Sequence, residues 1–237
     1  MRRPPGRSNP QVVTIRLLAP AGPVFSGRLA TVSARLRVAD HGALATWRWD
    51  DGAQDHQPIA SGAFVRTRRS HRYAAAGVYR VRVELGDSRE DGADRFVTVA
   101  DPRQVAASGW VRDVERGERV AFGFLIVPGG GPGRPHQLQL RALLGATELV
   151  TSNIEWLLTS QPGSLHFGGL ASIGDSAADH PYRCDVLRVA TTIGRDAQRL
   201  TLSVYEPGAV PGRDSPMHRV SGVVRPGHVA LGPFGEG

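Results

Sequence analysis

The chain has 237 residues, which is room for one large domain or two small ones. Apolar residues make up 41% and charged residues 22%, with 29 Gly and 17 Pro, a composition typical of a turn-rich globular protein. No run of about 20 apolar residues is present, which excludes a membrane-spanning helix. The one cysteine, Cys184, excludes a disulfide framework and is expected to be a small buried apolar residue.

The chain is strongly basic, with 29 Lys and Arg against 22 Asp and Glu and a formal net charge of +7. Every one of these basic residues is an arginine. The charge favours anionic partners. The arginines are spread along the chain, and aromatic residues make up only 6%, so the pattern does not favour a nucleic-acid-binding protein.

Residues 1–21 are expected to form an extended arm followed by the first strand. The arm begins Met-Arg-Arg-Pro-Pro-Gly and lacks the apolar stretch of a secretory signal peptide. It is suited to reach a neighbouring molecule, so self-assembly or hetero-assembly through the arm is one hypothesis.

Alternating polar and apolar residues predict a series of short strands in the first half of the chain. Residues 28–38 show the period most clearly, because every second residue from 30 to 38 is apolar. The predicted strands are residues 11–18, 28–38, 46–50, 62–69, 78–85 and 94–100. Short strands at this spacing predict a β-sandwich over residues 22–101.

Three stretches within that region carry a family resemblance. They are Trp-Asp-Asp-Gly at 49–52, Ser-His-Arg-Tyr-Ala-Ala-Ala-Gly-Val-Tyr-Arg-Val-Arg-Val at 70–83, and Val-Thr-Val at 97–99. Together they resemble a PKD (polycystic-kidney-disease-type) domain, in which the acidic turn after the tryptophan is longer than it is here. The resemblance implies an immunoglobulin-like sandwich in an extracellular or cell-surface protein.

Five residues of this motif have expected structural roles. Gly77 is expected to adopt the positive φ of a tight turn. Tyr79 is expected to hold a corner of the sandwich through a hydrogen-bonded hydroxyl. His71 and Tyr73 are expected to pack against Trp49.

Residues 102–108 are expected to be a short linker, and residues 109–231 a second, larger antiparallel sandwich, with a tail over residues 232–237. The predicted strands of this second domain are residues 119–127, 137–143, 152–158, 164–173, 183–190, 198–205 and 218–224. The order of these segments resembles the β module that often follows a PKD domain in bacterial surface and secreted proteins. The fold class is therefore predicted as all-β, with two tandem sandwiches.

No nucleophile elbow, zinc motif or phosphate-binding loop occurs in the sequence, so no catalytic residues are assigned and we expect a protein that is not an enzyme. Asp50, Asp51 and Asp55 lie close together in a predicted loop, and oxygen ligands in a loop can hold Ca²⁺. They are the main metal candidate, with Asp175 and Asp179 as a second one, while the alternative is that they cap backbone groups in turns. No other cofactor is implied.

Pairs of arginines alternate along three predicted strands. If these strands belong to one sheet, the side chains form a ladder of guanidinium groups on its outer face, and an anionic partner would relieve their mutual repulsion. The alternative is a solvated face balanced by the acidic residues at 84, 87, 90 and 91. The predicted face for an anionic partner consists of Arg35, Arg37, Arg66, Arg68, Arg80 and Arg82.

These observations predict a non-catalytic binding or structural module of the cell surface, contacting a partner protein or an acidic glycan, or serving as a subunit of a larger surface assembly. The alternative is the accessory domain pair of a secreted hydrolase that degrades polysaccharide or protein. In that case Trp110 and Trp156 would form a sugar platform, and Glu155 would be the one candidate acid.

Overall fold

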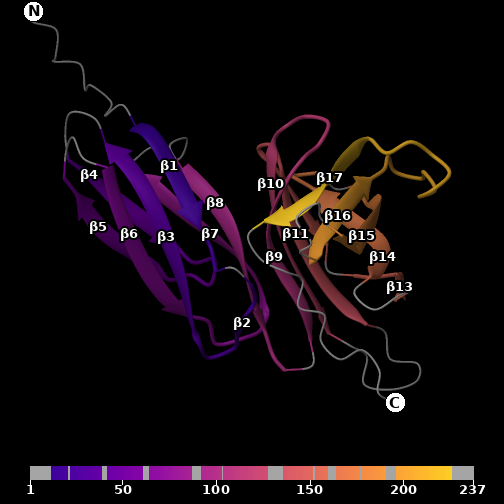
Figure 1. Cartoon of the computed structure of the whole chain (residues 1–237), viewed down its shortest axis with the longest axis horizontal. Helices are drawn as coiled ribbons and strands as arrows, with labels where there is room; N and C mark the ends of the chain where they lie inside the picture. Colours follow the sequence, from indigo (N-terminus) through magenta and orange to yellow (C-terminus); the bar gives the residue numbers. More distant parts are fainter. Residues whose placement is uncertain are drawn as a thin grey trace, which may run out of the picture. The chain divides into compact units, whose positions relative to one another are not determined.

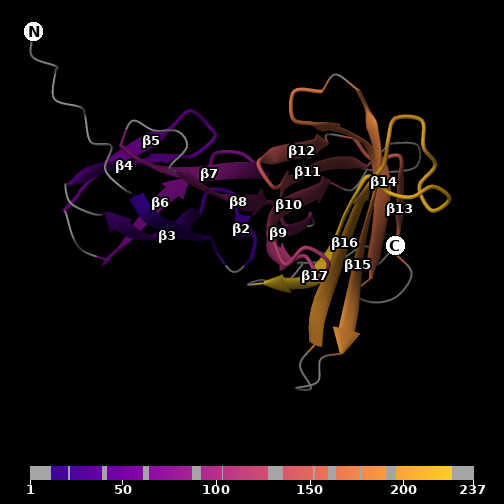
Figure 2. The same ribbon diagram turned by 90° about the horizontal axis from the view of Figure 1, so that it is seen from above.

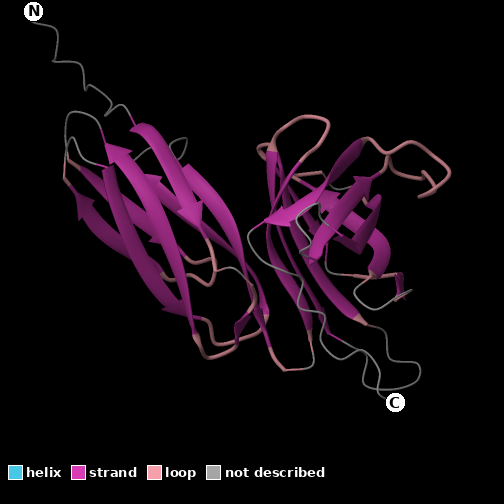
Figure 3. Ribbon diagram, viewed as in Figure 1, coloured by secondary structure: helices cyan, strands magenta, loops and turns pink. Residues whose placement is uncertain are grey.

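The computed structural model describes residues 12–20, 22–38, 42–60, 64–86, 92–102, 104–127, 136–151, 153–159, 164–176, 178–190 and 196–225. The predicted arm before residue 12 and the tail over residues 232–237 lie outside these residues. The described residues form strands, turns and loops without a helix, so the all-β prediction is confirmed (Figure 3). Among them, therefore, no helix is long and apolar enough to cross a membrane.

The strands before residue 101 form two separate sheets. The first sheet has the order β1-β3-β6, and the second has the order β2-β8-β7-β4-β5. Figures 1 and 2 show strands β3 and β6 in a different layer from β4, β5 and β7. Their bounds are β1 Val12–Leu18, β2 Val24–Phe25, β3 Leu29–Val38, β4 Ala43–Arg48, β5 Gln54–Ile59, β6 Phe64–Arg72, β7 Gly77–Leu85 and β8 Gly92–Ala100.

The two-residue period of the sequence decides which side chains are buried. In β3 every second residue from Ala30 to Val38 is buried, and the residues between them face outward. Trp47 and Trp49 are both fully buried, and their rings stack with centroids 6.0 Å apart. The predicted strand at 46–50 corresponds to β4, whereas the polar strand β5 has no counterpart in the prediction.

The strands after residue 104 form one antiparallel sheet of nine strands, in the order β12-β11-β10-β9-β17-β16-β15-β14-β13. A further pairing of β12 with β14 closes eight of these strands into a barrel. The bounds are β9 Val105–Arg112, β10 Arg119–Val127, β11 Gln137–Leu144, β12 Thr147–Thr151, β13 Trp156–Leu158, β14 Leu165–Ile173, β15 His180–Ala190, β16 Asp196–Val204 and β17 His218–Arg225.

This closed sheet differs from the second sandwich predicted for residues 109–231. The antiparallel pairing is as expected, but there is one sheet instead of two, and β9 begins at Val105 within the predicted linker. The strand pattern alone does not distinguish these cases, because both architectures alternate inward-facing apolar residues with outward-facing ones.

Side chains fill the interior of the barrel, as the size of an eight-stranded barrel allows. Phe124 contacts Phe167 edge to face at 5.4 Å, and Phe167 contacts Tyr182 at 6.3 Å. Cys184 is fully buried in the same core, as predicted, and burial raises the pKa of its thiol. Among the described residues the interior is therefore a packed apolar core.

Strand β10 is buried on both faces. Its outward-facing residues Ala121 and Leu125 pack with Val78 and Phe96 in a second apolar cluster. Gly123 lies between them, and a Cβ atom there would stand 2.6 Å from Cγ1 of Val78. A side chain at this position would therefore force the packed strands apart.

By contact density the chain divides into two compact units. The first comprises residues 1–19, 31–71 and 80–95, and the second comprises residues 20–30, 72–79 and 96–237. Of the seven arginines on β1, β3 and β6, Arg72 belongs to the second unit and the other six to the first.

Candidate anion-binding face

The outward face of the three-stranded sheet is rich in arginine. Strands β1, β3 and β6 contain seven arginines and no Asp or Glu. Six of these side chains are exposed to solvent, and the seventh, Arg69, is half-buried. The sixth exposed arginine, Arg72, belongs to the second unit, and the arginine face is formed by the five in the first unit: Arg16, Arg35, Arg37, Arg66 and Arg68.

The strand pairing sets three of these arginines in one row. Arg16 on β1 is paired directly with Arg35 on β3. On the other side of β3, Thr31 Oγ1 lies 2.8 Å from Ser70 Oγ, and the Arg37 guanidinium lies 5.1 Å from the centroid of the Phe64 ring. Both contacts fit one antiparallel register between β3 and β6, and this register places Arg35 opposite Arg66.

Without an anion, the three guanidinium groups in the row of Arg16, Arg35 and Arg66 repel one another. Directly opposed side chains in an antiparallel sheet have Cβ atoms about 4.5–5.5 Å apart, and like charges at this distance destabilise the sheet. Within the part of the chain that the structure describes, none of the six exposed arginines forms an ion pair with an acidic side chain. The face therefore has an uncompensated positive charge that an anion would neutralise.

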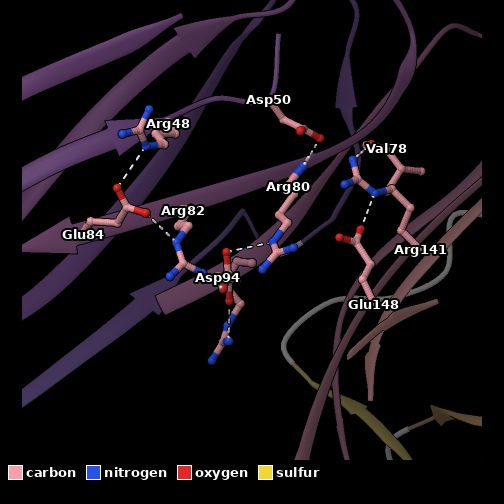
Figure 4. Close-up of polar contacts among 10 residues, drawn as sticks. Arg48, Asp50, Val78, Arg80, Arg82, Glu84, Asp94, Arg141 and Glu148 are labelled. Carbon is pink, nitrogen blue, oxygen red and sulfur yellow. Dashed lines mark hydrogen bonds and ion pairs between the residues drawn. The ribbon is translucent and has the colours of Figure 1, made fainter. Parts of the chain in front are cut away.

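Arg80 and Arg82 do not belong to this face. They lie on β7 in the five-stranded sheet, so the structure separates them from the other four arginines of the predicted ladder. Both are held in a chain of ion pairs, which Figure 4 shows. Arg80 Nε lies 2.9 Å and Arg82 Nη1 2.8 Å from the two carboxylate oxygens of Asp94, and Arg82 Nε donates to Glu84 at 2.8 Å.

Glu84 is the centre of this ion-pair chain. Its side chain is only 8% exposed, and it also accepts a hydrogen bond of 2.9 Å from Arg48 Nε. Burial alone would raise the pKa of Glu84, but the hydrogen bonds and charges of Arg48 and Arg82 outweigh burial and lower it. The alternative of a balanced face thus holds for Arg82 and Glu84, whereas the acidic residues at 87, 90 and 91 lie outside the described residues.

The three aspartates proposed for Ca²⁺ each have a protein partner. Asp50 accepts a hydrogen bond of 2.9 Å from the Arg80 amide, and Asp55 accepts one of 2.9 Å from Trp49 Nε1. Oδ2 of Asp51 lies 2.6 Å from Nε2 of His71. Among the residues that the structure describes, no group of three His, Cys, Asp or Glu side chains is placed to hold a metal ion.

The motif residues make most of the predicted contacts. His71 stacks on Trp49 with centroids 5.0 Å apart, and Tyr73 is fully buried and stacks on Tyr79 at 4.0 Å. The Tyr79 hydroxyl donates to the Ala75 carbonyl at 2.9 Å, as predicted for a corner.

The expectation of a positive φ at Gly77 is wrong. Gly77 does not have a positive φ and lies at the start of β7. A Cβ atom there would stand 3.2 Å from the Tyr79 ring, so the absence of a side chain lets this ring lie against the backbone. By contrast, Asp50 has a φ of 66°, a left-handed conformation that aspartate adopts more readily than most residues.

The tryptophans of the alternative sugar platform are separated in the barrel. Trp110 lies on β9 and Trp156 on β13, and four strands stand between them in the sheet order. Trp110 is covered by the Arg119 guanidinium at 4.6 Å, and the Trp156 indole packs against Gly168. The two rings therefore do not form one binding surface.

The arginine face includes two residues that were not predicted from the sequence, Arg16 and Phe64. Arg16 stands alone in a largely apolar strand, and only its pairing with Arg35 brings it into the row. The alternation Phe-x-Arg-x-Arg-x-Ser-x-Arg over residues 64–72 is the sequence pattern that indicates which side chains of this strand face outward together. Comparison with protein-family models, with curated proteins and with solved structures finds no match to this chain.

Proposed function

We propose that this protein is a non-catalytic binding module that attaches to an anionic partner through the arginine face. The observation that carries the proposal is the row of Arg16, Arg35 and Arg66, three exposed guanidinium groups on adjacent strands with no acidic residue in those strands. Guanidinium groups bind carboxylate and related oxyanions with two parallel hydrogen bonds, so an anionic ligand would gain both charge neutralisation and directional contacts.

The resemblance of residues 49–52, 70–83 and 97–99 to a PKD domain supports the same proposal. It implies an immunoglobulin-like sandwich built from the three-stranded and five-stranded sheets, in a protein of the cell surface or extracellular space. In that setting the partner is an acidic glycan or an acidic protein of a larger surface assembly. The exposed face of a sheet suits attachment, since it does not enclose a small substrate as a pocket does.

The test compares binding of dextran sulfate by the full chain and by two double variants. Arg66→Gln with Arg68→Gln removes two charges from the arginine face. Arg199→Gln with Arg219→Gln removes two charges from exposed positions on barrel strands and is the matched control. We expect the first variant to bind at least tenfold more weakly and the control to stay within twofold of the parent chain.

Uncharged dextran measures binding that does not depend on charge. An equal loss of affinity in both double variants would show that net charge alone attracts the polymer, and the proposal would be wrong. Failure of the parent chain to bind dextran sulfate at low ionic strength would also overturn it. Because all four arginines are exposed, we expect both variants to keep the parent unfolding free energy within about 0.5 kcal/mol.

A further inference from the structure

The arginine face is long and narrow. Its three strands lie about 4.8 Å apart, so the face is about 14 Å wide, while the nine residues of β6 extend for about 30 Å. The resulting area is about 400 Å², half of the roughly 800 Å² that one partner contributes to a standard protein–protein interface. The dimensions fit a linear chain better than the surface of a globular protein.

The charges on β6 are arranged along this long direction. Arg66 and Arg68 are both exposed and lie two residues apart, so they project from the same face of the strand. Neighbouring positions of this kind are about 7 Å apart. A ligand that carries one negative charge on each repeating unit would meet successive guanidinium groups along the strand.

The uncharged residues of the face indicate which linear anion fits. Thr31 and Ser70 hydrogen-bond to one another through their hydroxyl groups, and Ser33 lies on the same side of β3. Phe64 stands at one end of β6 with 77% of its surface exposed, and the Arg37 guanidinium lies over its ring. Hydroxyl groups and one open aromatic ring suit the hydroxyl groups and the apolar face of a pyranose ring.

Other linear or flat anions fit less well. Single-stranded nucleic acid binds through several aromatic side chains on which successive bases stack, and this face offers one exposed ring. Attachment to an anionic membrane by basic residues is stable when a second anchor accompanies them. The one exposed ring on β6 is covered on one side by Arg37 and is a poor anchor of this kind.

From these features, and resting on the proposed function, we infer that the ligand of the arginine face is a linear acidic polysaccharide that lies along β6, with its acidic groups on Arg66 and Arg68 and one sugar ring against Phe64. The row of Arg16, Arg35 and Arg66 extends the contact across the sheet and lets a neighbouring acidic group of the same chain bind beside the strand.

The experiment measures the affinity of the full chain for oligogalacturonates of increasing length, each of which has one carboxylate on every sugar. We expect the affinity to rise with length until the oligomer spans β6 and then to level off. Poly-L-glutamate, oligodeoxythymidylate and phosphatidylserine vesicles are the competing probes. Each should bind at least fivefold more weakly, per anionic group, than the oligogalacturonate that spans the strand.

Phe64→Leu separates sugar recognition from charge. Because the ring is exposed, this substitution should leave the unfolding free energy unchanged. It should weaken oligogalacturonate binding about threefold or more and leave poly-L-glutamate binding unchanged. Tighter binding of any competing probe, or an equal effect of Phe64→Leu on both polymers, would overturn the inference.

The outcomes distinguish this inference from the proposed function. If a competing probe binds more tightly, and its binding is lost in the double variant at Arg66 and Arg68, the polysaccharide assignment is wrong and the anion-binding face stands. If dextran sulfate and every other polyanion bind the double variant as well as the parent chain, both are wrong.

Discussion

The two sheets of the N-terminal half use outward-facing arginines in opposite ways. On the five-stranded sheet, Arg48, Arg80 and Arg82 are joined to Glu84 and Asp94 in a continuous chain of ion pairs. On the three-stranded sheet the strands contain arginine and no acidic residue. Arginine at alternate positions therefore does not by itself indicate a binding site. The residues on neighbouring strands decide whether each guanidinium group forms an ion pair within the protein or is left to bind a ligand.

The difference also separates stability from binding. Removing one partner from ion pairs at partly buried positions, such as those of Glu84, leaves uncompensated charge and destabilises the folded state. Opposed arginines at exposed positions weaken it slightly, and the loss is recovered when an anion binds. Substitutions in the ion-pair chain of the five-stranded sheet should therefore change mainly the unfolding free energy. Substitutions on the three-stranded sheet should change mainly the affinity for an anion.

The largest expected effect is that of Glu84→Gln. The substitution removes the carboxylate that Arg48 and Arg82 share, so the ion pairs of both arginines with Glu84 are lost, while Arg82 keeps its ion pair with Asp94. We expect the unfolding free energy to fall by about 2 kcal/mol in chemical denaturation, because hydrogen bonds to charged groups contribute about 1.5–3 kcal/mol. Glu206→Gln, at an exposed position, is the control and should change stability by less than about 0.5 kcal/mol.

Affinity for dextran sulfate should be retained in Glu84→Gln under conditions where the variant is folded. A clear loss of affinity without unfolding would show that the two sheets share one binding surface, and the comparison between them would be incorrect.

A smaller effect is expected from acidification. The pKa of Glu84 is lowered by Arg48 and Arg82 against the effect of burial, and the pKa of Asp51 is lowered by His71 and the Ala53 amide, again against burial. A carboxyl group whose folded pKa is lowered stabilises the protein above its unfolded pKa, and this contribution is lost as the pH falls through the folded value. Stability should therefore decrease below about pH 4.5, the ordinary range of these groups.

The affinity for dextran sulfate should not follow the pH dependence of the unfolding free energy. The arginine face is formed by guanidinium groups that stay charged throughout the range, so the affinity of the folded protein for dextran sulfate should be constant from about pH 5 to about pH 3.5, where its stability falls. Unfolding monitored by tryptophan fluorescence and binding measured by calorimetry give the two profiles on the same sample. If affinity and stability fell together as the pH is lowered, the assignment of stability to the ion-pair chain and of binding to the arginine face would be wrong.

The smallest effect is expected for Arg35→Glu. The new carboxylate would lie between Arg16 and the inferred neighbour Arg66, replacing two repulsions by two attractions. At low ionic strength we expect the unfolding free energy to rise by about 0.5 kcal/mol, since cross-strand charge pairs contribute about 0.2–1 kcal/mol. The gain should disappear in 1 M salt, where the screening length is about 3 Å.

The same variant should bind dextran sulfate much more weakly than the parent chain. Arg35→Gln is the matched control and should give a smaller gain in stability. A loss of stability in Arg35→Glu at low salt would mean that a negative charge close to this position already balances the row.

Local sequence pattern predicted the strand content because it depends on residues close together in the chain. The alternation in residues 28–38 corresponds to β3, and the ring-and-hydroxyl corner at Tyr79 has the predicted hydrogen bond. The pattern failed where the residues were polar, as in β5, or where a strand lay in a stretch expected to be a linker, as in β9. In these strands pairing with neighbours, and not side-chain propensity, holds the backbone extended.

The sequence by itself determined that this is an all-β protein with arginine as its only strongly basic residue and with outward-facing arginines on several strands. The tertiary structure alone decided that the later strands close into a barrel, that Arg80 and Arg82 are neutralised, and that Arg16 joins Arg35 in one row. The reason is that strand periodicity is local, whereas strand partners are set by contacts between residues far apart in the chain.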